Sequence, residues 1–182
     1  MDKLHLIVPC HFGVESVLKR EIIDLGYEIE RVEDGRITFS GNLLAICRAN
    51  VFLRTAERVM IQVGRVKAKT YDELFEAVKA LNWSNFIPEN GKFWVKKASS
   101  VKSKLFSPSD IQRIVKKAIV ENLKQEYGVS WFSEDGASYP IRVFFYKDEA
   151  VIALDTSGES LHKRGYRYYT SKAPISETLA AA

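Results

Sequence analysis

The first 66 residues carry one order of secondary-structure signals, and this order restricts the fold more than any other feature of the chain. Strand-like runs are expected at 4–8, 27–32, 36–40 and 59–66, and helices are expected at 13–25 and 42–50. The turn at Asp34 and Gly35 joins the two middle strands as a hairpin. Strand, helix, hairpin, helix, strand predicts an antiparallel sheet with helices on one face, which is the ferredoxin-like arrangement of an α+β protein.

The helix expected at 42–50 has closely spaced apolar side chains. The pattern predicts that its buried side consists of Leu43, Leu44, Ile46 and Cys47. The other cysteine, Cys10, also lies in an apolar context. Two isolated thiols without a C-x-x-C spacing favour buried small hydrophobes over metal ligands or a redox pair, and a disulfide between them stays open.

A second α/β region is expected from residue 67 onward. Thr70 and Glu73 form a capping box at the start of a helix. A strand is expected at 92–98, and the apolar runs at 140–146 and 150–154 predict a hairpin. Two packed α/β domains are therefore the expected architecture.

The helix that follows Ser107 is the most strongly signalled element of this region. Ser107 suits the N-cap, Pro108 suits the first helical position, and Asp110 favours the positive end of a helix that reaches Tyr127. Its expected buried side consists of Ile111, Ile114, Val115, Ala118 and Ile119. Basic residues gather on the opposite side, namely Arg113, Lys116, Lys117 and Lys124. A solvated face and a phosphate-binding surface explain this row equally well.

The loop before this helix adds further positive charge. Its lysines are Lys96, Lys97, Lys102 and Lys104, and together with the first amides of the helix they could converge on phosphate oxygens. Residues 1–91 carry 12 Lys and Arg against 13 Asp and Glu, a net −1, whereas residues 92–182 carry 15 against 10, a net +5. The basic character belongs to the second half, which favours a polyanionic partner there.

A third basic group lies near the C-terminus, where cations alternate with aromatic rings. Its members are His162, Lys163, Arg164, Tyr166 and Arg167. Cations that bind phosphates beside rings that stack bases are typical of RNA contact, although alternate rings could instead face a core. The pair Trp131 and Phe132 could also stack a base, but the adjacent Glu134 and Asp135 favour a structural role.

Several classes of function have no support in the sequence. His5 and His11 have no partner at metal-ligand or triad spacing, and no nucleophile with a base or pair of convergent carboxylates is recognisable. The apolar run at the N-terminus is too short for a signal peptide or a membrane span. We therefore expect a soluble, cytoplasmic protein that binds neither a metal nor a membrane.

Ordered segments along the chain resemble one known family. They are SVKSKLF, SPSDIQRIVKKAIVENL, LDTSGESLHKRGYR and APISETLAAA in the second half, and HFGVESVLKREIIDLGYE, GRITFSG and AICRANVFLRTAERV in the first. The chain resembles the THUMP-domain RNA methyltransferases. Within them it is most similar to the bacterial group that methylates the exocyclic amine of a guanine in large-subunit ribosomal RNA. The resemblance covers nearly the whole chain.

The resemblance implies a ferredoxin-like N-terminal domain at 1–66, a THUMP domain at 67–168, and at 169–182 a linker with the start of a catalytic-domain helix. It implies that the two domains bind and orient structured RNA. A following Rossmann-like domain would bind S-adenosylmethionine and hold the amine with an N-P-P-Y type motif. This chain has neither that motif nor a G-x-G type loop after a strand, so we expect it to lack the catalytic site and the cofactor and to be part of a larger enzyme.

The sequence thus predicts two groups of RNA-binding residues. They are Lys97, Lys102, Lys104, Arg113, Lys116, Lys117 and Lys124, and then His162, Lys163, Arg164, Tyr166 and Arg167. Whether the groups share one surface stays open. Two alternatives also remain, namely the RNA-binding part of a transfer-RNA methylase or thiouridine synthase, and a stand-alone protein that binds RNA or a small acidic ligand.

Overall fold

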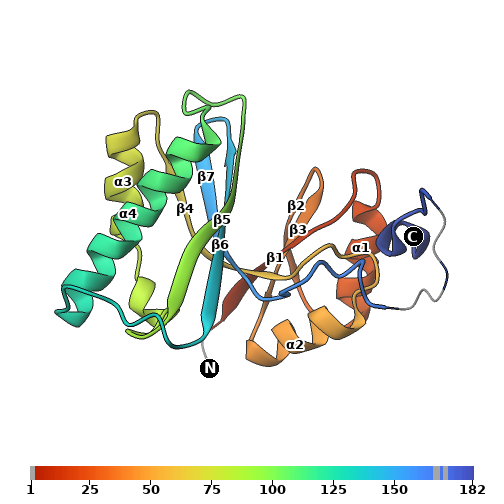
Figure 1. Cartoon of the computed structure of the whole chain (residues 1–182). Coiled ribbons are helices and arrows are strands. Elements are labelled where there is room, and N and C mark those ends of the chain that lie inside the picture. The colour runs from red at the N-terminus through yellow and green to blue at the C-terminus, as the bar shows by residue number, and fades with distance from the viewer. Residues whose placement is uncertain (1–2, 166–168, 170–171) are drawn as a thin grey trace. The chain divides into compact units, whose positions relative to one another are not determined.

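The computed structural model describes residues 3–165, 169 and 172–182, and the chain divides into two compact units (Figure 1). Unit 1 comprises residues 1–61 and 155–182, and unit 2 comprises residues 62–154. Unit 1 is therefore discontinuous in sequence, because the chain leaves it after Ile61 and returns to it at Asp155. The domain limits expected after residues 66 and 168 stay a prediction.

Unit 1 has the order of elements that the sequence predicted. Its elements are β1 (Leu4–Pro9), α1 (Glu15–Asp24), β2 (Ile29–Glu33), β3 (Arg36–Gly41) and α2 (Leu43–Phe52), and β4 (Met60–Lys67) begins here and continues in unit 2. The strands run antiparallel to their neighbours in the order β2-β3-β1-β4. Both helices cover one face of the sheet, because Leu18 of α1 and Ala49 of α2 share a core with Leu6 and Phe39. The expected α+β, ferredoxin-like arrangement is confirmed.

The buried side predicted for α2 is wrong for three of its four members. Leu43 and Leu44 keep 67% and 62% of their surface exposed, and Cys47 is also exposed, whereas Ala45 is fully buried. The reason lies at Gly41, where an added Cβ would come within 2.4 Å of the Cβ of Ala45. The helix lies too close to β3 for a larger side chain, so a small residue occupies the contact and the leucines face outward.

Unit 2 is a four-stranded sheet with two helices against it. Its elements are β4, α3 (Tyr71–Lys79), a 3-10 turn (Trp83–Asn85), β5 (Lys92–Val101), α4 (Pro108–Tyr127), β6 (Ser138–Tyr146) and β7 (Glu149–Asp155), whose last residue belongs to unit 1. The strand order is β4-β7-β6-β5, with β5 parallel to β6 and β6 antiparallel to β7. Figure 1 shows α3 and α4 side by side over this sheet, with β5 at its edge.

Helix α4 confirms the strongest signal in the sequence. The Ser107 hydroxyl accepts a hydrogen bond from the amide of Asp110 at 3.4 Å, Pro108 is the first helical residue, and Gly128 ends the helix with φ of 66°. Its buried residues are Ile111, Val115, Ala118, Ile119 and Leu123. This apolar side fixes which way the basic side points, because residues opposite a buried stripe face solvent.

The segment after β7 is held in unit 1 by polar contacts. The Arg58 guanidinium pairs with the Asp155 carboxylate at 2.8 Å, and the side chain of Asp155 is fully buried. A short helix, α5 (Glu177–Ala180), follows Ser176 and places Thr178 so that its hydroxyl donates to Glu57 at 2.7 Å. These contacts are the physical reason why residues 155–182 group with the first 61.

Candidate nucleic-acid interface

The exposed side of α4 carries a row of cations, which we call the basic row: Arg113, Lys116, Lys117 and Lys124. The first three are exposed, and Lys124 is half-buried in the last turn of the helix. The Arg113 guanidinium pairs with the carboxylate of Asp110 at 3.0 Å. The Nζ atom of Lys117 lies 5.7 Å from the centroid of the Phe75 ring on α3. The row predicted from helical spacing is thus present as one face of a single element.

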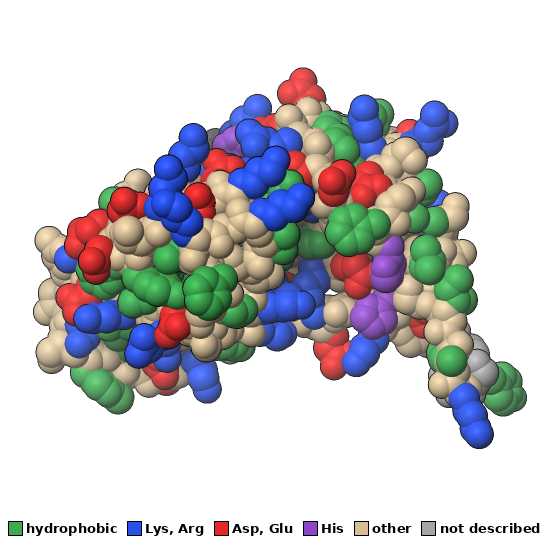
Figure 2. Space-filling view, turned by 90° about the horizontal axis from the view of Figure 1, so that it is seen from above, with side chains coloured by type: hydrophobic (Ala, Val, Ile, Leu, Met, Phe, Trp, Pro, Cys, Tyr) green, Lys and Arg blue, Asp and Glu red, His purple; other side chains and the backbone are tan. Residues whose placement is uncertain are grey.

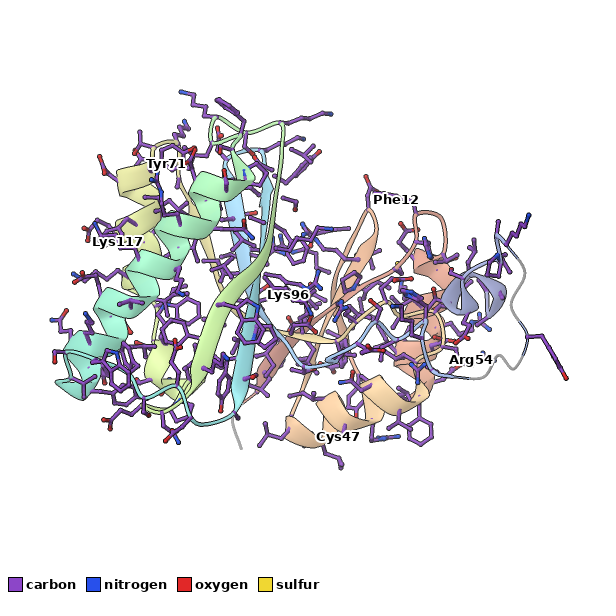
Figure 3. The ribbon with its side chains drawn as sticks, viewed as in Figure 1. Phe12, Cys47, Arg54, Tyr71, Lys96 and Lys117 are labelled. Atoms are coloured by element: carbon purple, nitrogen blue, oxygen red, sulfur yellow. The ribbon has the colours of Figure 1, made fainter. Side chains whose placement is uncertain are left out.

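Two of the three lysines of β5, Lys96 and Lys97, lie at a bulge. The register with β6 shifts between Val95 and Lys97, which leaves Lys96 as the extra residue of β5. Lys96 and Lys97 are both exposed. In Figure 3, Lys96 lies on the side of β5 away from Lys117, so it is not part of the basic row.

The loop after β5 lies at one end of the sheet of unit 2 and is tied to two neighbouring loops. Lys102 has a left-handed backbone, with φ of 52°, and the amide of Lys104 donates to Oδ1 of Asp148 at 2.7 Å. The amide of Asp148 donates to Oγ of Ser103 at 3.0 Å, and its carbonyl oxygen accepts from the amide of Ala68, also at 3.0 Å. Asp148 therefore fixes three loops against one another.

This end of unit 2 carries more lysines than the sequence predicted. We call it the basic end, and its exposed lysines are Lys67, Lys69, Lys102, Lys104 and Lys147. Figure 2 looks down on the loops of this end and shows Lys and Arg side chains gathered there. The sequence prediction missed Lys67, Lys69 and Lys147, because the loops that carry them meet only through the strand order β4-β7-β6-β5. The available signal in the sequence was a lysine at the end of a strand, as for Lys67, or just beyond it, as for Lys147.

Charge at the basic end comes from lysines rather than from the amides of α4. Pro108 has no N–H group, and the amide of Asp110 already donates a hydrogen bond to the hydroxyl of Ser107. The first turn of α4 therefore offers fewer free N–H donors to an anion than we expected. Of the two acids that follow Lys147, Asp148 accepts from the amide of Lys104, and Glu149 pairs with Arg65 at 3.3 Å. The lysines are therefore the main source of positive potential here.

A shallow groove of about 420 Å³ lies between β5 and α4. It is lined by Trp94, Val95, Gln112, Arg113, Lys116 and Lys117. The Nε2 atom of Gln112 donates to the carbonyl oxygen of Val95 at 3.1 Å and joins the two walls. This groove was not predicted, because the run FWVKKA is typical of any strand.

The second predicted group of RNA-binding residues, which begins at His162, lies in unit 1, and two of its members bind the protein itself. Nδ1 of His162 lies 3.3 Å from a carboxylate oxygen of Glu57. The Arg164 guanidinium donates to the carbonyl oxygens of Val51 at 2.9 Å and Leu53 at 2.6 Å, at the end of α2. Carbonyls at a helix C-terminus lack helical partners, so Arg164 has a structural task in unit 1.

RNA contact by the other members of this group, Lys163, Tyr166 and Arg167, stays a prediction. Lys163 is exposed. Tyr166 and Arg167 lie outside the described residues. Because the basic row and the basic end belong to unit 2, the two predicted groups lie on different units.

Metal binding, membrane spanning and thiol chemistry have little support in the part of the chain that the structure describes. In residues 3–165, 169 and 172–182, no group of three or more His, Cys, Asp and Glu side chains could hold a metal ion. No helix within the same residues is long and apolar enough to cross a membrane. Cys10 and Cys47 are free thiols, and burial, with a smaller effect of the charges on Glu15 and Glu57, raises the pKa of Cys10 to about 12. Cys10 is therefore poorly suited to nucleophilic chemistry, which needs the thiolate.

Two family models match the chain. The model described as the RlmL ferredoxin-like domain matches residues 5–60, and the model described as the THUMP domain matches residues 68–155. The first match lies within unit 1, and all but the last residue of the second lies within unit 2.

Longer proteins are similar to the whole chain. YpsC of Bacillus subtilis, named as a candidate RNA methyltransferase, is 55% identical over all of this chain and 47% of its own length. Ribosomal RNA large subunit methyltransferase K/L of Pseudomonas aeruginosa is 33% identical over all of this chain and 25% of its own length. The crystal structure of SMU.472, described as a candidate methyltransferase complexed with SAH, has a TM-score of 0.92 and 41% identity over all of this chain and 48% of its own. The chain thus spans between a quarter and about half of these proteins.

Proposed function

The chain joins an RlmL ferredoxin-like domain to a THUMP domain, and from this we propose that it binds and orients ribosomal RNA as one part of an RNA methyltransferase. The observation that carries the proposal is the position of the exposed cations, since the basic row and the basic end both lie on the unit that the THUMP model matches. Lysines bind RNA chiefly through its phosphates. Holding the RNA is part of catalysis, because methyl transfer needs the acceptor nitrogen held in a fixed position and direction relative to the methyl carbon.

The reaction that we propose for the longer protein is methylation of a guanine exocyclic amine in large-subunit ribosomal RNA, with S-adenosylmethionine as donor. The RNA class is supported by the name of the K/L relative, the donor by the SAH bound to SMU.472, and the guanine amine by the sequence resemblance alone. The donor and the acceptor amine would be bound by the part of those relatives that lies outside the match, because this chain contains neither a G-x-G type loop after a strand nor an N-P-P-Y motif.

The basic row is tested by charge reversal. We expect the affinity for a large-subunit ribosomal RNA fragment to fall steeply with salt, and the variant Lys116→Glu with Lys117→Glu to lower the slope of log affinity against log salt by roughly two units. The measurement is fluorescence anisotropy from low to physiological salt. The matched control is Lys19→Glu with Arg20→Glu, an adjacent exposed pair on α1 with the same change of charge. Equal slopes for the two variants would remove the basic row from the interface.

The class of RNA is tested by competition. We expect ribosomal RNA fragments to displace the labelled probe at lower concentration than transfer RNA of equal length does. A preference for transfer RNA would instead support the alternative of a transfer-RNA methylase or thiouridine synthase. The enzymatic part of the proposal is tested with the native gene product, by transfer of labelled methyl groups from S-adenosylmethionine to unmodified ribosomal RNA.

A further inference from the structure

The groove between β5 and α4 combines an aromatic side with a cationic side. Trp94 and Val95 of β5 are half-buried, whereas Arg113, Lys116 and Lys117 of α4 are exposed. Its volume of about 420 Å³ falls in the range of roughly 300–1,000 Å³ that is typical of small-ligand sites. All of these residues belong to unit 2. The groove is therefore large enough for one flat, negatively charged ligand group.

Two lysines supply most of the charge that such a ligand would meet. The charge of Arg113 is offset by Asp110 at 3.0 Å. Lys117 lies over the Phe75 ring at 5.7 Å, and this contact with a ring face leaves N–H donors of the ammonium for an anion. Within the described residues, no ion pair engages Lys116. Lys116 and Lys117 are thus placed to bind phosphate oxygens beside the aromatic side of the groove.

A protein strand is a poor occupant for the same groove. β5 is the edge of its sheet, and an edge strand can accept a further strand through its unpaired backbone groups. However, the side chain of Gln112 already donates to the carbonyl oxygen of Val95 at 3.1 Å. The carbonyl oxygen of Val95 is therefore already bonded to a side chain of α4, and the exposed cations favour a polyanion over a peptide.

We infer that the groove binds an unpaired nucleotide of the RNA, with its base against the indole of Trp94 and the neighbouring phosphates on Lys116 and Lys117. This inference rests on the proposed RNA binding and adds to it a requirement for a base outside a duplex. Paired bases cover their faces by stacking within the helix, whereas unpaired bases can be splayed out and stacked on aromatic side chains. The groove would thus select RNA that has a bulge, loop or single-stranded end.

The test uses two RNA hairpins with identical stems, one fully paired and one with a single bulged nucleotide. The bulged nucleotide is 2-aminopurine, whose fluorescence is quenched by stacking, or 5-iodouridine, which crosslinks to aromatic rings in contact under light. We expect the chain to bind the bulged hairpin on the order of tenfold more tightly than the paired one. We also expect quenching of the 2-aminopurine on binding, and a crosslink that maps to the peptide carrying Trp94.

Two substitutions separate stacking from general affinity. Trp94→Leu keeps an apolar side chain in the groove but removes the ring, so the preference for the bulged hairpin should fall from about tenfold to about one. The control is Trp131→Leu, because Trp131 is 76% exposed and does not line the groove. The control should keep both the preference and the quenching.

The outcomes distinguish this inference from the proposed function. If both hairpins bind equally and salt-dependently, and no crosslink reaches Trp94, the inference is overturned while RNA binding by the chain stands. If neither hairpin nor any ribosomal RNA fragment binds in a salt-dependent way, the proposed function is overturned together with it. If Trp94→Leu does not fold, the quenching of 2-aminopurine and the crosslink in the unchanged chain still show whether an unpaired base stacks on Trp94.

Discussion

The basic end of unit 2 and the basic segment at 162–164 in unit 1 look alike in sequence, yet their cations are used differently. At the basic end, the structure fixes the backbone of Lys104 through Asp148 and leaves the lysine side chains exposed. In the segment of unit 1, the side chain of Arg164 itself is bonded to carbonyl oxygens, and His162 lies against a carboxylate. At the basic end the lysine side chains face solvent, whereas in the segment at 162–164 the side chains of His162 and Arg164 bind other groups of unit 1.

The difference follows from the chemistry of the two cations. A guanidinium offers five donors in a planar fork and can bind several carbonyls at once, whereas an ammonium is a compact and strongly hydrated charge. Arginine therefore serves well inside a network such as that of Arg164, and lysine serves well on a surface that exchanges water for phosphates. A count of basic residues does not distinguish these uses, but their effects on stability and on RNA affinity should.

The largest expected effect is on the buried ion pair of unit 1. Replacing Arg58 by Met removes the guanidinium that pairs at 2.8 Å with the fully buried carboxylate of Asp155, which keeps its hydrogen bond from the amide of Ser157. We expect the free energy of unfolding to fall by about 3 kcal/mol or more, because breaking a buried ion pair by removing one partner is strongly destabilising. Urea denaturation followed by circular dichroism measures it. A loss below about 1 kcal/mol would show that the structural cations of unit 1 matter little, and Arg58→Lys serves as the variant that keeps the charge.

The next effect should be found at Arg164. Arg164→Ala removes the hydrogen bonds to Val51 and Leu53, and we expect it to lower the free energy of unfolding by about 2 kcal/mol. The neighbouring Lys163→Ala should change it by less than about 0.5 kcal/mol, since Lys163 is exposed. Denaturation curves of both variants give the stabilities, and the salt slope of RNA binding is measured alongside. If Arg164→Ala lowered the salt slope of RNA binding and left the free energy of unfolding unchanged, Arg164 would contact RNA and would not stabilise the end of α2.

At the basic end, the effect on stability should be small and the effect on binding large. The triple variant Lys102→Gln, Lys104→Gln and Lys147→Gln removes three exposed charges, so we expect the free energy of unfolding to stay within about 0.5 kcal/mol. The slope of log affinity for RNA against log salt should fall by up to roughly three units. Anisotropy titrations at several salt concentrations give the slope. If the triple variant lost stability but kept the salt slope of RNA binding, the lysines of the basic end would be structural, contrary to the difference proposed between the two regions.

The smallest effect on stability at neutral pH is expected from the two thiols, Cys10 and Cys47, which both lie in unit 1. Because one is buried and the other exposed, their rates of modification show whether burial controls the reactivity of a thiol within one unit. N-ethylmaleimide at pH 8 should modify Cys47 quickly and Cys10 only as the chain unfolds, because Cys10 is buried and its pKa is raised to about 12. A raised pKa means that the folded state keeps the thiol neutral where the unfolded state ionises. The contribution of Cys10 to stability is therefore complete below pH 9.0 and is lost as the pH rises toward about 12.

Mass spectrometry of the modified peptides, with Cys47→Ser as the control, measures the two rates. Equal rates for the two thiols in the folded chain would contradict the burial of Cys10.

Local signals in the sequence predicted the elements well. Ser107, Pro108 and Asp110 predicted the start of α4 because a cap acts within one turn, and the strand and helix order predicted the ferredoxin-like arrangement. The buried side of α2 was wrong because hydrophobicity ranks leucine above alanine, and only the distance between Gly41 and Ala45 shows that the larger side chain does not fit.

The candidate site was predicted only where one element carries it. The basic row follows from helical spacing on α4, so sequence alone could place its members on one face. Lys67 at the end of β4 and Lys147 just after β6 join the basic end only because both strands pair with β7 in the sheet. Trp94 becomes a candidate only when α4 packs beside β5 and forms the groove. Arg164 was assigned to RNA because nothing in its own segment indicates the carbonyls of α2.

The discontinuity of unit 1 has a consequence for the time course of synthesis. Unit 2 is complete when residue 154 has been made, whereas unit 1 waits for Asp155, the partner of Arg58, and for Thr178, which binds Glu57. At roughly 5–20 residues per second, the last stretch takes on the order of seconds. The unit that begins first on the ribosome is thus the last to have all of its contacts, and the nascent chain contains every residue of unit 2 before unit 1 is complete.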